Sequence, residues 1–247
     1  MTFKYILNEN YTSFKEFLLN IQSNFQENSA TIHKARNELK IIEYEGISTV
    51  VKAFKVPNII NKIAYTFFRD SKAKKSYTYS VKISKYTPAP IGYIEFFKLG
   101  LLSESFFISK EFKYDFTIRE PLLDAEFDDA KEIFKAFTRF TLELHNDGIF
   151  HDDYSPGNIL IKKENENYTF KIVDINRMIF KELSEDERAK NFSKLWAHDH
   201  ILEIMADEYT KHYPCGENFK QQVLHYSNQN KKIKNFKKRL KGKPVND

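Results

Sequence analysis

Three polar residues with the chemistry of a phosphoryl-transfer site occur in one short stretch of the chain, residues 145–177. Asp153 is followed five residues later by Asn158, an apolar strand begins immediately after it, and Asp174 closes a second apolar strand. In phosphoryl transfer, one aspartate takes the proton of the attacking hydroxyl, while an asparagine and a later aspartate hold metal ions at the phosphates. The spacing therefore indicates metal-dependent phosphoryl transfer.

Each of these residues also has a simpler interpretation when it is taken alone. Asp153 and Asn158 flank the turn-forming sequence Ser155-Pro156-Gly157, where both residue types are common, and Asp174 can cap a turn. His151 is interpreted as a hydrogen-bonded loop residue with a structural role. An Asp and an Asn at this spacing form a weak pattern, and the two apolar strands that follow make the combination more specific.

A lysine from the first half of the chain would complete such a site. Lys52 lies in the middle of the β-branched, apolar sequence ISTVVKAFKV, residues 47–56. On its own it would be interpreted as an edge-strand residue that points to solvent. With a phosphoryl-transfer loop downstream, it becomes the candidate that neutralises nucleotide phosphates.

Apolar periodicity predicts the elements that position these residues. In the first half it predicts helices at 11–27, 58–68 and 71–85, the last capped by Ser71, and strands at 38–44, 47–56, 91–97 and 105–112. Glu45-Gly46 is the predicted turn between the first two strands. A polar connection, residues 109–117, is predicted to lead into the second half.

The second half is predicted to be mostly helical. A long helix from Asp124 ends near His145, with Gly148 as its stop signal. Strands are predicted at 159–161 and 170–173, and further helices begin at Ser184, cover about 191–213 and run into the C-terminus. The sequence therefore predicts an α+β protein of two lobes, residues 1–112 with a small antiparallel sheet and residues 113–247 mostly helical.

The composition is that of a globular protein, since hydrophobic residues make up 41% of the 247 and aromatic residues 15%. The single cysteine, Cys215, allows no internal disulfide and fits a reducing compartment. Because the sequence shows neither a secretory signal nor an apolar run of about 20 residues, the protein is predicted to be cytoplasmic.

The net charge of +5 is unevenly distributed along the chain. Residues 231–243, here called the basic tail, hold eight of the 39 Lys and Arg residues, whereas residues 1–230 carry a charge of −2. Ile233, Phe236 and Leu240 lie between the lysines at helical spacing, which predicts a basic amphipathic helix in peripheral contact with an anionic membrane. A solvated helix face or a disordered end is the simpler alternative. No nucleic-acid partner is expected, because no recognition motif accompanies the tail.

Residues 151–158 (HDDYSPGN) resemble the catalytic loop of protein-kinase-like enzymes, and Asp174-Ile175-Asn176-Arg177 resembles their metal-binding motif. Within that superfamily, the chain is most similar to the bacterial lipopolysaccharide kinases that phosphorylate Kdo or heptose of the inner core. The supporting stretches are VVKAF at 50–54, DSKAKKSY at 70–77, TPAPIGYIE at 87–95 and ELHNDGIFHDDYSPGNIL at 143–160.

This resemblance implies a two-lobed kinase fold, ATP with a divalent metal such as Mg²⁺, and a lipid-linked sugar acceptor at the inner face of the cytoplasmic membrane. It implies Asp153 as the catalytic base, Asn158 and Asp174 as metal ligands, and Lys52 as the lysine on the phosphates. Gly46 is the only glycine at 40–48, where a glycine-rich loop is expected, and is the candidate for backbone contact with the nucleotide.

One departure from the family leaves other functions open. The segment from Pro57 to Tyr86 contains a single acid, Asp70, whereas the family has a glutamate near the position of Thr78 that would pair with Lys52. A pseudokinase that binds nucleotide without turnover is therefore an alternative. A small-molecule kinase of the aminoglycoside or choline type, which has a similar loop, is another.

Two features of the loop favour a small acceptor over a protein. Asp152 stands where Arg or Gly is usual, so the loop lacks the group that clamps a phosphorylated activation segment. Only about ten residues separate Asp174 from the helix signal at Ser184, and no A-P-E sequence is present. A sugar hydroxyl is therefore the favoured phosphate acceptor.

Overall fold

The structure, a computed structural model of the chain, describes residues 2–28, 31–34, 37–55, 58–242 and 244–245. The chain divides into two compact units, Met1–Lys113 and Tyr114–Asp247, and the division falls within the predicted polar connection. Val56, the last residue of a predicted strand, and Lys243 of the basic tail lie outside the described residues.

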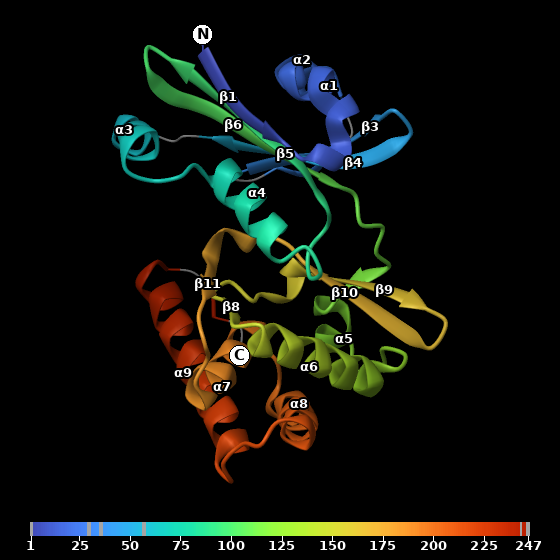
Figure 1. The fold of residues 1–247 in the computed structure, drawn as a ribbon. Coiled ribbons are helices and arrows are strands. Elements are labelled where there is room, and N and C mark those ends of the chain that lie inside the picture. The colour runs from blue at the N-terminus through green and yellow to red at the C-terminus, as the bar shows by residue number, and fades with distance from the viewer. Residues whose placement is uncertain (1, 29–30, 35–36, 56–57, 243, 246–247) are drawn as a thin grey trace. The chain divides into compact units, whose positions relative to one another are not determined.

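Unit 1 is built on a six-stranded antiparallel sheet with the strand order β1-β5-β6-β4-β3-β2 (Figure 1). Its strands are β1 (Thr2–Leu7), β2 (Thr31–Lys34), β3 (Asn37–Tyr44), β4 (Ile47–Lys55), β5 (Pro90–Lys98) and β6 (Leu101–Lys110). Its helices are η1 (Glu9–Phe14), α1 (Lys15–Leu19), α2 (Ile21–Glu27), α3 (Ile59–Phe67) and α4 (Lys72–Lys82).

The sheet has two different faces, because successive side chains of a strand alternate. On one face, Val51 of β4 and Ile94 of β5 pack against α1 and α2 in the main core of the unit. The helical residues of this core are those of the predicted apolar stripe, Phe14, Phe17, Leu18, Ile21 and Phe25. Full burial of such a side chain contributes about 1.5–3 kcal/mol, so the stripe holds these helices on the sheet.

The other face carries Lys52 and a smaller cluster of Phe54, Tyr93 and Ala73, the last from α4. The predicted cap of α4 is confirmed, since the Ser71 hydroxyl accepts a hydrogen bond from the Lys74 amide at 3.0 Å. The α4 helix thus packs on the face of the sheet from which Lys52 projects.

The continuous helix predicted at 11–27 is wrong in one respect, because three short helices replace it. Tyr11 has non-helical backbone angles, and α1 ends at Leu19, before Asn20, whose side chain donates a hydrogen bond to the Glu16 carbonyl at 3.1 Å. Short polar side chains compete with the helical backbone in this way. Strand β1 was not predicted, because Phe3 and Ile6 on its two sides are both about half exposed and no alternating pattern results.

Unit 2 is mostly helical, with two small sheets. Its helices are α5 (Arg119–Leu123), α6 (Ala130–Asn146), α7 (Glu185–Phe192), α8 (Asp199–His212) and α9 (Phe219–Leu240), with 3₁₀ turns η2 (Pro156–Asn158), η3 (Ile175–Arg177) and η4 (Ser193–Leu195). Its strands are β7 (Phe116–Thr117), β8 (Ile149–His151), β9 (Ile159–Glu164), β10 (Asn167–Ile172) and β11 (Met178–Phe180), in the orders β10-β9-β7 and β11-β8.

Several predicted boundaries in this unit are confirmed and two are corrected. The α6 helix ends at Asn146, before Gly148 at φ 68°, and Ser184 caps α7 in a capping box with Glu187. However, α6 begins at Ala130 instead of near 124. The helix predicted around 191–213 is interrupted at Trp196, which adopts a left-handed backbone conformation (φ 59°, ψ 26°).

The predicted α+β fold class is confirmed, with an antiparallel sheet in the first unit and a mostly helical second unit. The three-residue strands β8 and β11 were not predicted, since runs this short carry no usable periodicity. No helix among the described residues is both long and apolar enough to cross a membrane.

Candidate active site

His151 joins the two segments that carry the candidate catalytic residues. It ends β8, is buried, and pairs in register with Met178 of β11. Its Nδ1 accepts a hydrogen bond from the Asp153 amide at 3.1 Å, and its Nε2 lies 3.2 Å from the Val173 carbonyl. These partners require an unprotonated Nδ1 and a protonated Nε2, which is the neutral ring. Burial lowers the pKa of His151, although the Val173 carbonyl and nearby carboxylates oppose this effect.

Asn158 closes the loop from the other side. Its Nδ2 donates to the Asp153 carbonyl at 2.9 Å, which leaves Oδ1 on the far side of the amide. The Asn158 carbonyl accepts a hydrogen bond from the Val173 amide at 2.9 Å, and this bond continues the β9–β10 ladder. Asp174 is the next residue after Val173. The structure therefore brings Asp153, Asn158 and Asp174 together within unit 2.

Asp174 leaves the end of β10 in a left-handed conformation (φ 54°, ψ 44°), which aspartate tolerates better than most residues. Its Oδ1 accepts a hydrogen bond from the Asn176 side chain at 3.2 Å. A carboxylate and an amide oxygen are the kind of hard ligands that Mg²⁺ prefers, with substrate phosphates and waters completing its octahedron. Asn158 and Asp174 thus have the donor chemistry to hold the implied metal.

A chain of buried hydrogen bonds connects the loop after β8 to α6, α7 and α8. The Asn191 side chain donates to the His151 carbonyl at 2.9 Å and contacts His145 Nε2 at 3.1 Å. His145 Nδ1 lies 2.9 Å from the Tyr209 hydroxyl, to which Arg188 donates at 2.9 Å. Burial lowers the pKa of His145 to about 4, against the hydrogen bond to Asn191, so this ring is also neutral.

Charged groups surround the two loop aspartates within unit 2. Arg177 Nη1 lies 3.4 Å from Asp153 Oδ2, and Lys194 Nζ lies 3.0 Å from Asp152 Oδ1. The Asp152 amide also donates to the Arg177 carbonyl at 3.0 Å. Sequence inspection missed Arg177 and Lys194 because neither belongs to the loop. The local signal for Arg177 was its place as the last residue of the motif that resembles a metal-binding sequence.

Lys52 and Gly46 lie on the same hairpin of unit 1. Glu45 (φ 49°) and Gly46 (φ 72°) form a two-residue turn between β3 and β4, as predicted, and such a turn favours glycine. Lys52 Nζ lies 5.4 Å from the centroid of the Phe54 ring.

Several aromatic side chains lie on the same face of the sheet as Lys52. The residue opposite it on β6 is Phe107, and on α4 Tyr77 packs on Tyr93 with 5.5 Å between ring centroids, while Thr78 is exposed. Among the described residues of unit 1, the buried carboxylate is that of Glu95. This residue lies opposite Ser105 in the pairing of β5 with β6.

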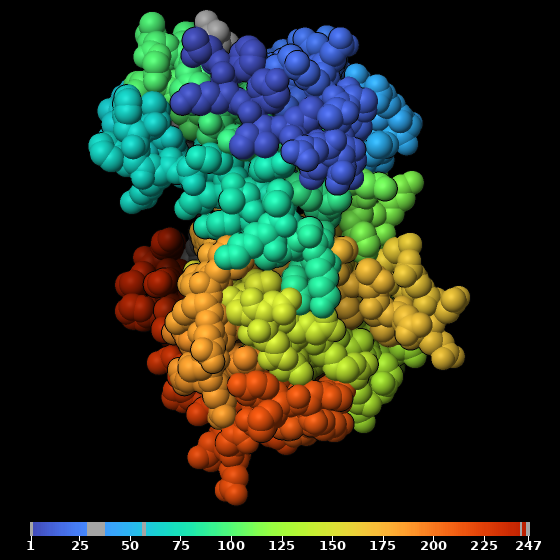
Figure 2. All heavy atoms as spheres, viewed as in Figure 1, coloured from blue at the N-terminus to red at the C-terminus, as the bar shows by residue number. Residues whose placement is uncertain are grey.

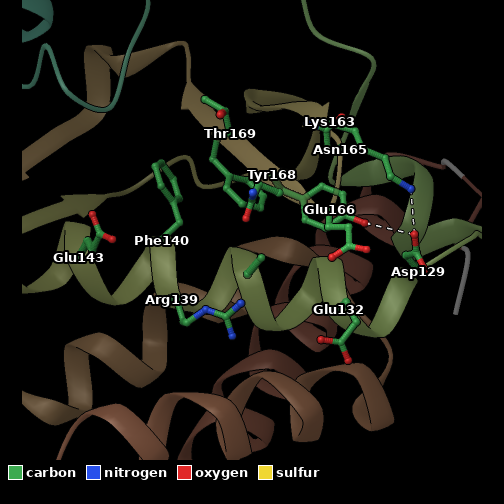
Figure 3. Close-up of a pocket in the computed structure, with 13 residues that line it drawn as sticks. Asp129, Glu132, Arg139, Phe140, Glu143, Lys163, Asn165, Glu166, Tyr168 and Thr169 are labelled. Atoms are coloured by element: carbon green, nitrogen blue, oxygen red, sulfur yellow. Dashed lines mark hydrogen bonds and ion pairs between the residues drawn. The ribbon is translucent and has the colours of Figure 1, made fainter.

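A cavity of about 780 Å³ lies at the other end of the β9–β10 hairpin, between the hairpin tip and α6 (Figure 3). Its wall includes Glu132, Glu143 and Glu166, and a Lys163–Asp129 ion pair of 2.8 Å spans its rim. Asp153, Asn158 and Asp174 are not among the lining residues of this cavity, whose lining residue nearest to Asp174 in the sequence is Phe170. The cavity is thus separate from the candidate site.

An antiparallel-sheet unit followed by a mostly helical unit is the arrangement of a protein-kinase-like fold. Among solved structures, "WaaP in complex with acyl carrier protein" has this fold. It matches with a TM-score of 0.62 and 12% sequence identity, over 93% of this chain and 99% of that one. WaaP is a lipopolysaccharide core heptose kinase, so the chain has a lipopolysaccharide-core-kinase-like fold. No profile of a known family matches the sequence, and no curated protein matches it.

Proposed function

We propose that this protein is an ATP-dependent kinase that phosphorylates a sugar hydroxyl, of Kdo or heptose, in the inner core of lipopolysaccharide. The observation that carries the proposal is the hydrogen-bonded link through His151. That residue bonds to the Asp153 amide on one side and to the carbonyl next to Asp174 on the other. One buried ring thus joins the backbone of the candidate base to the backbone beside a candidate metal ligand. The fold shared with WaaP supports the same conclusion.

In this proposal Asp153 orients the acceptor hydroxyl and takes its proton as the oxygen attacks the γ-phosphorus of ATP. Asn158 and Asp174 hold Mg²⁺, which would neutralise charge on the phosphates when bound. Lys52 adds a positive charge on the phosphates, and the backbone at Gly46 contacts the nucleotide. Arg177 holds the Asp153 carboxylate in place before the acceptor arrives.

The segment after Asp174 supports a small acceptor. It forms η3 and then β11, which pairs with β8 from Met178 to Phe180. The Lys181 amide also bonds to the Gly148 carbonyl at 2.9 Å before α7 begins. The segment is therefore bound to the body of unit 2 along most of its length, and it is too short to present a peptide.

The outer face of α9 supports a contact with an anionic membrane, where a lipid-linked acceptor would be presented. Ile233, Phe236 and Leu240 are 48%, 61% and 72% exposed, and Lys232 and Lys237 flank them. Apolar side chains that enter the interface and lysines near anionic lipid, each worth about 1 kcal/mol, would bind the protein peripherally. On this proposal the protein works at the inner face of the cytoplasmic membrane.

The experiment that tests the function is transfer of labelled phosphate from ATP to a Kdo-bearing lipid A precursor. Asp153→Asn keeps the size of the side chain and removes the base. We expect the rate to fall by about 100- to 10,000-fold while the thermal unfolding curve stays unchanged. An unaltered rate in this variant would contradict the role of Asp153.

The same assay distinguishes the two alternative functions. Transfer to an aminoglycoside or choline, with none to the lipid A precursor, would favour a small-molecule kinase. Thermal stabilisation by Mg-ATP without transfer to any acceptor would favour a pseudokinase. The exposed Thr78, in place of a glutamate on α4, is the observation that makes the pseudokinase worth testing.

A further inference from the structure

We propose that Lys234 and Lys238 of α9, positioned by Trp196, form a subsite that binds an oxyanion of the acceptor beside the catalytic loop. The inference rests on the proposed kinase function and names the class of acceptor, a saccharide that carries a carboxylate or a phosphate near the reacting hydroxyl. It assigns the inner face of α9 to substrate recognition.

Trp196 organises this subsite. It stands between η4 and α8 in the left-handed conformation (φ 59°), which is rare for a bulky side chain. Backbone outliers of this kind persist where the surrounding structure holds them and often occur at functional sites. Lys234 Nζ lies 5.2 Å and Lys238 Nζ 5.5 Å from the centroid of the indole ring. The ring thus holds two ammonium groups, one turn apart on α9, on one aromatic surface.

The subsite is connected to the catalytic loop through Lys194. This residue lies two positions before Trp196 and forms the 3.0 Å ion pair with Asp152, the neighbour of Asp153. Burial and the nearby Lys194 hold the pKa of Lys234 below its usual value, while Asp153 opposes them. Lys234 is therefore within electrostatic range of the candidate base as well as of two other lysines.

The neighbouring lysines differ in their ion pairs with acids. Lys231, the preceding lysine on this side of α9, donates to the Ala197 carbonyl at 2.7 Å and lies 3.7 Å from Asp199. For Lys234 and Lys238, the described part of the chain shows the Trp196 ring as the partner and no carboxylate in an ion pair. Like charges held close together cost free energy, and an incoming oxyanion would remove that cost.

The two sides of α9 are thereby given different roles. A helix turns about 100° per residue, so Lys234 and Lys238 share the side of the buried Val223 and Ser227. Ile233, Phe236 and Leu240 lie on the outward side, and the C-terminal part of α9 is at the surface of unit 2 (Figure 2, dark red). The apolar side faces the proposed membrane contact, and the lysines on Trp196 face the loop.

Trp196 is the only tryptophan in the chain, so its fluorescence reports on the subsite without any need for turnover. The probes are free Kdo, which carries a carboxylate, and inorganic phosphate. We expect a saturable fluorescence change for the wild type. In the double variant Lys234→Gln/Lys238→Gln, the affinity should fall by about tenfold or more, as for lost hydrogen bonds to charged groups. The response to the two probes identifies which oxyanion the subsite prefers.

The matched control is Lys232→Gln/Lys237→Gln, which removes the same charge from exposed positions of the same helix. It should leave the titration unchanged, and in a kinase assay with free Kdo as the acceptor, where membrane binding plays no part, only Lys234→Gln/Lys238→Gln should raise KM for the acceptor while KM for ATP stays constant. The absence of a saturable change in the wild type, or equal weakening in both variants, would overturn the proposal. So would normal probe binding in Lys234→Gln/Lys238→Gln together with a loss of binding to vesicles of anionic phospholipid, which would assign these lysines to the membrane.

The titration separates this inference from the proposed function. Probe binding that depends on Lys234 and Lys238 in a protein without measurable transfer would support the subsite and contradict the kinase. Transfer with no dependence on these lysines would do the opposite.

Discussion

The loop between β8 and β9 in unit 2 and the Lys52 face of the sheet in unit 1 are held in place by different forces. In the loop, directional hydrogen bonds join the side chains of His151 and Asn158 to the Asp153 backbone, and the Asn191 side chain donates to the His151 carbonyl. On the Lys52 face, the lysine ammonium lies 5.4 Å from the centroid of the Phe54 ring, and Tyr77 packs on Tyr93.

This difference indicates that the positions of the candidate residues in unit 2 are fixed more closely than the position of Lys52. Hydrogen bonds fix both the orientation of a group and its distance from its partner, the latter to a fraction of an ångström. Proton transfer and metal ligation need this precision. Aromatic packing excludes water and fixes position less narrowly, which suits a point charge acting on phosphates over several ångströms. The residues of unit 2 should therefore tolerate substitution far less than Lys52 does.

The largest expected effect is on the metal ligand in unit 2. Asp174→Asn keeps the left-handed backbone, which asparagine also accepts, but removes the charge that would hold Mg²⁺. We expect phosphate transfer to fall by about 1,000-fold, or about 4 kcal/mol in the barrier. Glu166→Gln, at the exposed tip of the β9–β10 hairpin, loses the same charge and should keep the wild-type rate. Equal rates in the two variants would remove Asp174 from the site.

The second prediction concerns the effect of acid on the two units. The pKa of His145 falls from 6.5 in the unfolded chain to about 4 in the folded protein because the ring is buried. Between these two values the unfolded state binds more protons, so stability is full above pH 6.5 and is lost as the pH falls towards 4. At about 1.4 kcal/mol per pH unit, His145 alone accounts for a loss of about 3 kcal/mol. His151, whose pKa is also lowered, adds to the loss in the same direction.

Hydrogen exchange at pH 7 and pH 5, corrected for intrinsic exchange rates, checks this prediction by region. Protection should weaken in β8, β11 and α7 of unit 2 and stay constant in β4, β5 and β6 of unit 1. His200→Gln, at an exposed histidine, should not change the pattern. A uniform loss of protection in both units would show that the contrast between them does not extend to stability.

The smallest expected effect is on the lysine of unit 1. Lys52→Met should reduce kcat/KM for ATP by about tenfold, or about 1.4 kcal/mol, because it removes one positive charge that would act on the phosphates over several ångströms. Lys55→Met, three residues on and exposed, should change kcat/KM by less than about twofold. If Lys52→Met lowers the activity as much as Asp174→Asn does, the two regions are equally sensitive to substitution. That result would contradict the proposed difference between them.

The sequence was sufficient for the features that depend on neighbouring residues. The fold class, the strands β3, β4, β5 and β9, the caps at Ser71 and Ser184, and the end of α6 shortly before Gly148 follow from local periodicity and local hydrogen bonds. It was insufficient where a polar residue interrupted an apolar pattern, as Asn20 does between α1 and α2. It was also insufficient where a strand was too short or too exposed to show a pattern, as in β8, β11 and β1.

By itself, the sequence determined which residues are candidates for the chemistry. Asp153, Asn158 and Asp174 each adjoin a strand or turn whose pattern is visible in a few consecutive residues. Only the tertiary structure decided what surrounds them. The contacts that join His151 to Val173, Asn191 to His151 and His145 to Tyr209 span 22, 40 and 64 residues. Contacts over such separations depend on how helices and strands pack, which no local pattern records, and the cluster of Lys234, Lys238 and Trp196 depends on packing in the same way.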